Sequence, residues 1–181
     1  VEKMLSSILS TNKGIWNGRY QSYQTIDPKK LPWLISCDQI FPKPDTPGLV
    51  LAGYARDWPE SRGFFVNAHN NLHIWVNYLE HVHILSVERN VHVVRCLQRA
   101  LEAEKALEDA IQSYQRDFLQ RHVPKLSEAK KKDDETKFST GFVCHDKIGY
   151  MTSSPQFFGT GQGLVLFEAR LHVANHTCFV W

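Results

Sequence analysis

The chain has 181 residues with 21 basic and 19 acidic side chains, and its formal net charge is +2. This balance lacks the clustered basic excess that nucleic-acid binding requires, so we expect no DNA or RNA partner. The length points to one domain with a proper core, since 43% of the residues are hydrophobic. The longest apolar runs are far shorter than the roughly 20 residues of a membrane-spanning helix, and we expect no signal peptide, since no charged segment followed by an apolar one is seen at the start. We therefore expect no membrane insertion.

The four cysteines, at positions 37, 96, 144 and 178, form no C-x-x-C pair. Their scatter favours a reducing, cytoplasmic setting over disulfides or a structural zinc site. Cys96 falls in a helical pattern and is expected to be a buried free thiol. Cys144 and His145 could form a thiolate pair, but neighbouring residues on a strand point to opposite faces.

Residues 1–47 are predicted to form a leading region of short helices and turns. One short helix opens the chain, and Asp27-Pro28 is typical of the N-cap and first position of another. The proline-rich run at 41–47 cannot continue that helix and predicts a turn-rich connector.

Residues 48–90 are predicted to form antiparallel strands. Leu49–Leu51 and residues 63–66 are short apolar runs, whereas 72–77 and 82–87 alternate with period two. The connecting turns are short, which favours antiparallel pairing because parallel pairs need a long crossover.

Residues 91–124 are predicted to form one long helix, because apolar residues recur mostly three or four apart. These are Val94, Leu97, Leu101, Leu107, Ile111, Tyr114 and Phe118, while Glu104, Glu108 and Asp109 are expected to face solvent. A charged loop at 125–140 and terminal strands at 141–181 follow, with strands expected at 148–152 and from Leu164 to Val173. The fold class predicted is α+β, an antiparallel sheet flanked by helices.

The segment at 53–63, Gly-Tyr-Ala-Arg-Asp-Trp-Pro-Glu-Ser-Arg-Gly, resembles the sequence that enters the catalytic domain of the phosphagen (guanidino) kinases, such as creatine and arginine kinases. Further motifs match in order and spacing: Phe41-Pro42-Lys43-Pro44, Trp75-Val76-Asn77, Gly149-Tyr150 and Gly159-Thr160-Gly161. The resemblance runs from Val1 to about His172, with an insertion at roughly 107–140. It implies part of a guanidino-kinase catalytic domain.

The family transfers the γ-phosphoryl group of ATP to a guanidinium nitrogen with Mg²⁺, which requires positioning, cationic clamps on the phosphates and a carboxylate for the guanidinium. By the resemblance, the catalytic carboxylate position is occupied by Leu79 and a phosphate-binding arginine position by His83. Leucine cannot accept a proton, and neutral histidine replaces a guanidinium poorly. Glu80 is the neighbouring carboxylate, but on a strand it would point to the opposite face, so it could substitute only if the loop slips.

Three more positions depart from the family. Ser154 replaces its reactive cysteine, Gly163 stands where it has another phosphate-binding arginine, and Asp38 replaces a nucleotide-contacting histidine. The glycine loop at Gly159, Thr160 and Gly161 could cradle phosphate through backbone N–H groups, but a strand follows rather than a helix, so tight-turn geometry is the favoured interpretation.

Four histidines, His69, His73, His81 and His83, raise the question of a metal site. His81 and His83 could share one face of a strand, but no acidic or cysteine partner completes a pattern, so no metal is expected.

These losses favour a catalytically inactive structural or interaction module, bound to other proteins of a larger assembly and using no cofactor. A cytoplasmic location is expected, with a cytoskeletal, ciliary or axonemal setting by analogy with the family. One alternative is an ATP:guanidino phosphotransferase completed by sequence or chains outside this one. Another is a nucleotide sensor that binds without turnover.

Overall fold

The computed structural model describes residues 1–11, 13–88, 92–122, 141–153, 159–167 and 175–180, with only the backbone described over 164–167 and 175–180. It has the predicted α+β architecture. Six antiparallel strands form one sheet in the order β1-β2-β3-β4-β8-β7. They are β1 (Gly18–Ser22), β2 (Gly63–Asn67), β3 (Leu72–Val76), β4 (Val82–Glu88), β7 (Gln162–Phe167) and β8 (Asn175–Val180).

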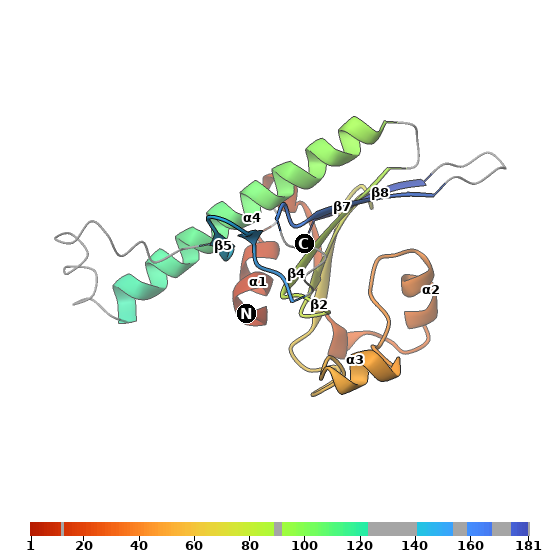
Figure 1. Ribbon diagram of the computed structural model, residues 1–181. Helices are drawn as coiled ribbons and strands as arrows, with labels where there is room; N and C mark the ends of the chain where they lie inside the picture. Colours follow the sequence, from red (N-terminus) through yellow and green to blue (C-terminus); the bar gives the residue numbers. More distant parts are fainter. Residues whose placement is uncertain (12, 89–91, 123–140, 154–158, 168–174, 181) are drawn as a thin grey trace.

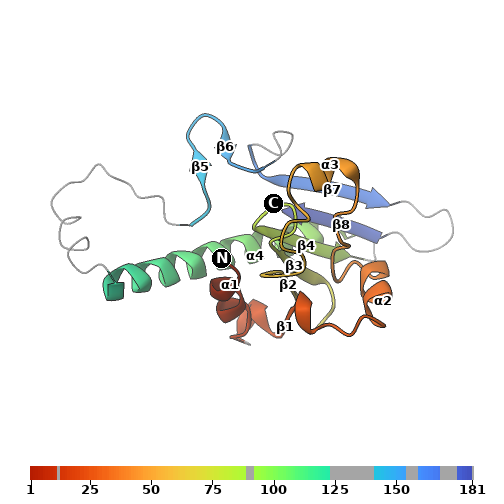
Figure 2. The ribbon, with the colours of Figure 1, turned by 90° about the horizontal axis from the view of Figure 1, so that it is seen from below.

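Helices cover both faces of this sheet. Figure 1 shows α1 (Glu2–Leu9) and α4 (Val93–His122) on one side, and α2 (Leu31–Ser36) and α3 (Pro47–Leu51) on the other. Two short 3₁₀ helices lie at Gly14–Trp16 and Tyr23–Thr25. The small hairpin of β5 (Cys144–His145) and β6 (Gly149–Tyr150) stands apart from the main sheet (Figure 2).

The buried residues of the face under α1 and α4 are mostly aliphatic, with Trp16 and Phe65 among them. The period-two pattern of β3 and β4 points Leu72, Ile74, Val76, Val82 and Ile84 into this core. We call it the aliphatic face.

The opposite face is aromatic. Tyr23, Phe41 and Phe64 are buried there, and Trp58, Trp75 and Tyr78 pack against them. Ring centroids of Phe41 and Tyr78 lie 4.6 Å apart in a stacked pair, and those of Tyr23 and Trp58 lie 4.6 Å apart edge to face. We call it the aromatic face.

The long helix is confirmed at Val93–His122, a length of about 45 Å at 1.5 Å per residue. Its buried residues are Cys96, Ala100, Ala103, Leu107 and Ile111, whereas Val94, Leu97, Leu101, Tyr114 and Phe118 are exposed. Leu107 and Ile111 of the predicted stripe are thus buried, together with the small residues Cys96, Ala100 and Ala103, and the other five residues of the stripe are exposed.

The helix is tied to the sheet by polar contacts that the sequence did not suggest. The Cys96 thiol, buried and free as predicted, donates to the Ser86 carbonyl at 3.0 Å. Arg99 and Glu88 form an ion pair of 2.9 Å in which both side chains are largely buried. Glu104, expected in solvent, is half-buried beside Gln162, and burial raises its pKa.

Several predicted elements differ. Leu49–Leu51 is the end of helix α3 rather than a strand, because Pro47 occupies the first helical turn and the Thr46 carbonyl accepts from the amide of Val50. The helix expected at Asp27-Pro28 begins at Leu31; the Asp27 carboxylate instead accepts from the amide of Lys29 in a turn. Strand β1 was not predicted, whereas β8 falls within the terminal strands expected at 141–181.

The C-terminal part was predicted in outline. The strand expected at 148–152 is reduced to β6, and the one expected from Leu164 ends at Phe167. The charged loop at 125–140 and residues 168–173 lie outside the described residues. No described helix is long and apolar enough to cross a membrane.

Candidate functional site

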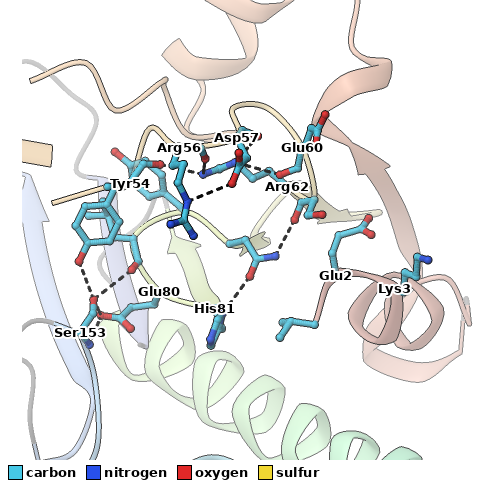
Figure 3. A pocket seen from close by; sticks show the side chains of 16 residues that line it. Glu2, Lys3, Tyr54, Arg56, Asp57, Glu60, Arg62, Glu80, His81 and Ser153 are labelled. Atoms are coloured by element: carbon cyan, nitrogen blue, oxygen red, sulfur yellow. Dashed lines mark hydrogen bonds and ion pairs between the residues drawn. The ribbon is translucent and has the colours of Figure 1, made fainter. Parts of the chain in front are cut away.

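A hollow of about 800 Å³ opens beside the β3–β4 turn. Three further segments line it: the start of the chain, the turn before β2, and Ser153. Its described lining residues are Val1, Glu2, Lys3, Gly53, Tyr54, Arg56, Asp57, Glu60, Ser61, Arg62, Asn77, Tyr78, Leu79, Glu80, His81 and Ser153. Figure 3 shows Glu80 and Ser153 at one end, and Glu2 and Lys3 at the other.

Arg62 holds the turn before β2 together. Its guanidinium donates to the backbone carbonyls of Tyr54, Arg56, Asp57 and Glu60 at 2.9–3.2 Å, and it lies over the Trp58 ring at 5.1 Å. Burial lowers its pKa. Because its bonded donors face backbone carbonyls, Arg62 has a structural role.

Arg56, unlike Arg62, is exposed and forms an ion pair. It pairs with Asp57 at 3.2 Å, and the two side chains are 85% and 68% exposed. Such an exposed pair is easily opened. Arg56 and Lys3 are the exposed cations among the residues that line the hollow.

Glu80 lies in the turn between β3 and β4 rather than on a strand. The alternation that would have turned it away from Leu79 therefore does not apply, and both residues line the hollow. Asn77, at the start of this turn, adopts a φ of 56°, which redirects the chain at the end of β3. The structure thus places a carboxylate beside the position that the resemblance assigns to the catalytic one.

Ser153 holds the Glu80 carboxylate. Its amide donates to Glu80 Oε1 at 2.8 Å, and its hydroxyl also lies within hydrogen-bonding distance of that oxygen. The Tyr54 hydroxyl donates to Ser153 Oγ at 3.1 Å (Figure 3). None of these polar links was foreseen from the sequence, because the three residues are 26 or more positions apart.

Of the predicted site residues that the structure describes, Leu79 alone lines the hollow. His83 is 2% exposed and stacks on Trp75 with ring centroids 6.1 Å apart, on the aromatic face. Burial lowers the pKa of His83 to about 3, so its ring is neutral at physiological pH. It cannot replace a phosphate-binding arginine.

Other predicted positions lie elsewhere. Asp38 is exposed after α2, and its carbonyl oxygen lies 2.8 Å from His73 Nδ1. Gly163 lies in β7, opposite Phe179, and Ser154 is outside the described residues.

The glycine loop makes a close backbone contact. The amide of Tyr150 donates to the Gly159 carbonyl at 2.8 Å, and a Cβ on Gly149 would lie 2.3 Å from that oxygen. Gly159 and Gly161 have φ of 106° and 64°. This agrees with the tight-turn interpretation of Gly159, Thr160 and Gly161.

The histidines do not converge. His73 contacts Asp38 and Asn70, His81 contacts Asn77, and His83 lies in the aromatic face. Within the described part of the chain, no three histidine, cysteine or acidic side chains lie close enough together to hold a metal ion.

The hollow suits the guanidino substrate of the family better than the phosphates of its nucleotide. Carboxylates at Glu2, Asp57, Glu60 and Glu80 suit a guanidinium group. The phosphates of a Mg²⁺-bound nucleotide need several fixed cations, and the described lining offers only Lys3 and Arg56 exposed. The described residues therefore do not form a nucleotide site by themselves.

Comparison with known protein families identifies the family of this chain. The model of the ATP:guanido phosphotransferase C-terminal catalytic domain matches residues 1–165. This chain belongs to that family. The resemblance drawn from the sequence motifs is thus confirmed.

Relatives of this guanidino-phosphotransferase domain are creatine kinases. The flagellar creatine kinase of Strongylocentrotus purpuratus is 29% identical over 96% of this chain and 12% of its own length. The M-type creatine kinase of Homo sapiens is 24% identical over 99% of this chain and 41% of its own. The chain therefore spans less than half the length of these relatives.

Solved structures agree on the fold. Lombricine kinase superposes with a TM-score of 0.69 at 17% identity, over 98% of this chain and 50% of that one. The substrate-free duplicated taurocyamine kinase of Schistosoma mansoni gives 0.68 at 16%, over 99% and 25%. At such identities the likeness concerns the fold alone.

Proposed function

We propose that this domain is part of an ATP:guanidino phosphotransferase in which Glu80 supplies the carboxylate for the guanidino substrate. The observation that carries the proposal is the position of Glu80 in the hollow, one residue after Leu79 and held by Ser153. It favours the enzyme, an alternative from the sequence, over the inactive module.

The chemistry required of Glu80 is modest. A carboxylate accepts two parallel N–H donors from a guanidinium and so orients the attacking nitrogen. It can also accept the proton that this nitrogen loses when phosphorylated. Phosphoryl transfer otherwise depends on positioning and on charge stabilisation.

The phosphate-binding cations must come from beyond the described lining. Because the chain covers 41% of M-type creatine kinase, such cations have room elsewhere in a longer protein. Lys3 and Arg56 would then contribute at the edge of the site.

The test is turnover by the full-length protein with Mg-ATP and creatine, taurocyamine, lombricine or arginine. We expect activity with one of them, and Glu80→Gln should lower kcat by about 10²-fold or more. Glu102→Gln is the control, since it removes a charge from an exposed position on α4 outside the hollow and should leave kcat within about threefold. Absence of turnover with every substrate, or equal effects of both variants, would overturn the proposal.

A second candidate is the non-catalytic module that binds other proteins of an assembly. Leu79 and the neutral, buried His83 favour it, since neither can serve the role that the family's motif assigns. The decisive variant is Leu79→Glu in the full-length protein. Turnover that appears only in this variant would support the inactive module, and calorimetry with Mg-ADP would separate it from a nucleotide sensor. Partners, and a cytoplasmic, cytoskeletal or axonemal location, stay predictions.

A further inference from the structure

We propose that His83 and Ser153 are positioning residues that together hold the Glu80 carboxylate toward the hollow, an inference that rests on the role proposed for Glu80. His83 acts on the backbone of Glu80 and Ser153 on its carboxylate. One therefore sets the path of the turn and the other the direction of the side chain.

The contact from His83 comes from inside the protein. Its Nε2 lies 3.1 Å from the amide nitrogen of Glu80 and accepts that N–H. The imidazole is wedged against two aromatic rings, with centroids 6.1 Å from Trp75 and 5.8 Å from Tyr78. A buried ring packed against two aromatic neighbours has little freedom to turn its acceptor nitrogen away from the Glu80 amide.

This contact requires an unprotonated Nε2, because a protonated imidazole has donors on both nitrogens. Burial keeps the ring neutral, with a pKa of about 3. The residue that occupies an arginine position in the family's motif is thus unsuited to bind phosphate but suited to accept a backbone amide.

The contact from Ser153 comes from a distant segment of the chain and is exposed. Its amide and hydroxyl both approach Glu80 Oε1, and a charged acceptor attracts a hydroxyl proton more strongly than the Leu79 carbonyl, which lies 3.2 Å from the same Oγ. The Tyr54 hydroxyl donates to Ser153 Oγ at 3.1 Å. The proton of the Ser153 hydroxyl is then directed at the Glu80 carboxylate. Tyr54, Ser153 and Glu80, from three distant segments, are thereby linked in one chain of hydrogen bonds that ends on the Glu80 carboxylate.

The backbone contact is tested by amide hydrogen exchange on the full-length protein. His83→Phe keeps an aromatic ring in the buried site but removes the acceptor, and His83→Gln keeps a carbonyl acceptor. We expect exchange at the Glu80 amide to rise about fivefold in His83→Phe relative to neighbouring strand amides, and to return toward the wild-type rate in His83→Gln. Equal Glu80 exchange in all three proteins would overturn the role of His83.

The carboxylate contact is tested by kinetics on the full-length protein. Ser153→Ala should lower kcat about tenfold with a smaller change in KM, because the carboxylate remains but is less well directed. Ser153→Thr retains the hydroxyl and should restore most of kcat. An unchanged kcat in Ser153→Ala would overturn the role of Ser153.

The two proposals fail in different ways. If the wild-type protein has no turnover, the proposed function falls, and the exchange experiment still decides whether His83 orders the turn. If the wild-type protein is active but both sets of variants behave like it, the positioning falls while the function stands.

Discussion

The two faces of the sheet are built for different tasks. On the aliphatic face, Leu72, Ile74 and Val76 pack under α1 and α4 with nearly all their surface removed from water. On the aromatic face, Trp75, Tyr78 and His83 lead to the turn that carries Glu80 into the hollow. The same two strands, read at alternate positions, therefore supply both a core and the support for a site.

This difference shows why the fold and the site can diverge separately. Aliphatic packing depends on volume and pattern, and it tolerates many sequences. The aromatic face must also offer directed polar atoms, such as His83 Nε2 beside the Glu80 amide. Substitutions at this turn change the chemistry while the sheet is preserved.

The largest effect should come from the aliphatic face. Leu107→Ala removes a fully buried side chain and should lower the free energy of unfolding by about 3 kcal/mol. Leu101→Ala is the matched control on the same helix, where the leucine is 40% exposed, and should cost less than about 1 kcal/mol. Urea unfolding measures both, and similar losses would contradict the assignment of the buried stripe.

The next effect concerns the two arginines at the rim of the hollow. Arg62→Lys cannot reproduce donation to four carbonyls and should cost about 2–3 kcal/mol in unfolding free energy. Arg56→Lys changes an exposed pair and should stay within about 0.5 kcal/mol. If Arg56 proved the more costly of the two, the structural role of Arg62 would be wrong.

The smallest effect is a pH dependence from the aromatic face. The pKa of His83 is lowered from 6.5 to about 3 by burial, so the unfolded chain binds more protons below pH 6.5. The contribution of His83 to the free energy of unfolding is complete above pH 6.5. It should fall by about 2 kcal/mol between pH 8 and pH 5, because protons bind to the unfolded chain.

Comparison with His83→Gln isolates the pH-dependent contribution of His83 to the free energy of unfolding, because glutamine does not titrate. The unfolding free energies of the two proteins should converge or cross as the pH falls. Parallel curves between pH 8 and pH 5 would show that His83 is not buried as a neutral ring.

Much of the fold followed from residue patterns. Alternation at 72–77 and 82–87 and the helical spacing over 91–124 were sufficient for three of the main elements. The helix at Pro47–Leu51 was missed because a short apolar run fits either structure; Thr46-Pro47, an N-cap followed by proline, was the available indication. Strand β1 carries no apolar run, since its residues are polar or half-buried.

The site was predictable only in part. The motifs located the β3–β4 turn and drew attention to Leu79 and His83. They did not decide the direction of Glu80, because strand alternation was applied to a residue that lies in a turn. Ser153 gave no local indication at all, since its role depends on contacts with residues 73 and 99 positions away.

From composition and motif order alone came the family, the antiparallel α+β class and the changes at Leu79, His83 and Gly163, because these depend on residue identity and short-range spacing. Only the tertiary structure decided that Arg62 serves the backbone, that His83 is neutral, and that Glu80 faces the hollow. Those outcomes depend on burial and on hydrogen bonds between distant segments, and neither is set by residues that are neighbours in the chain.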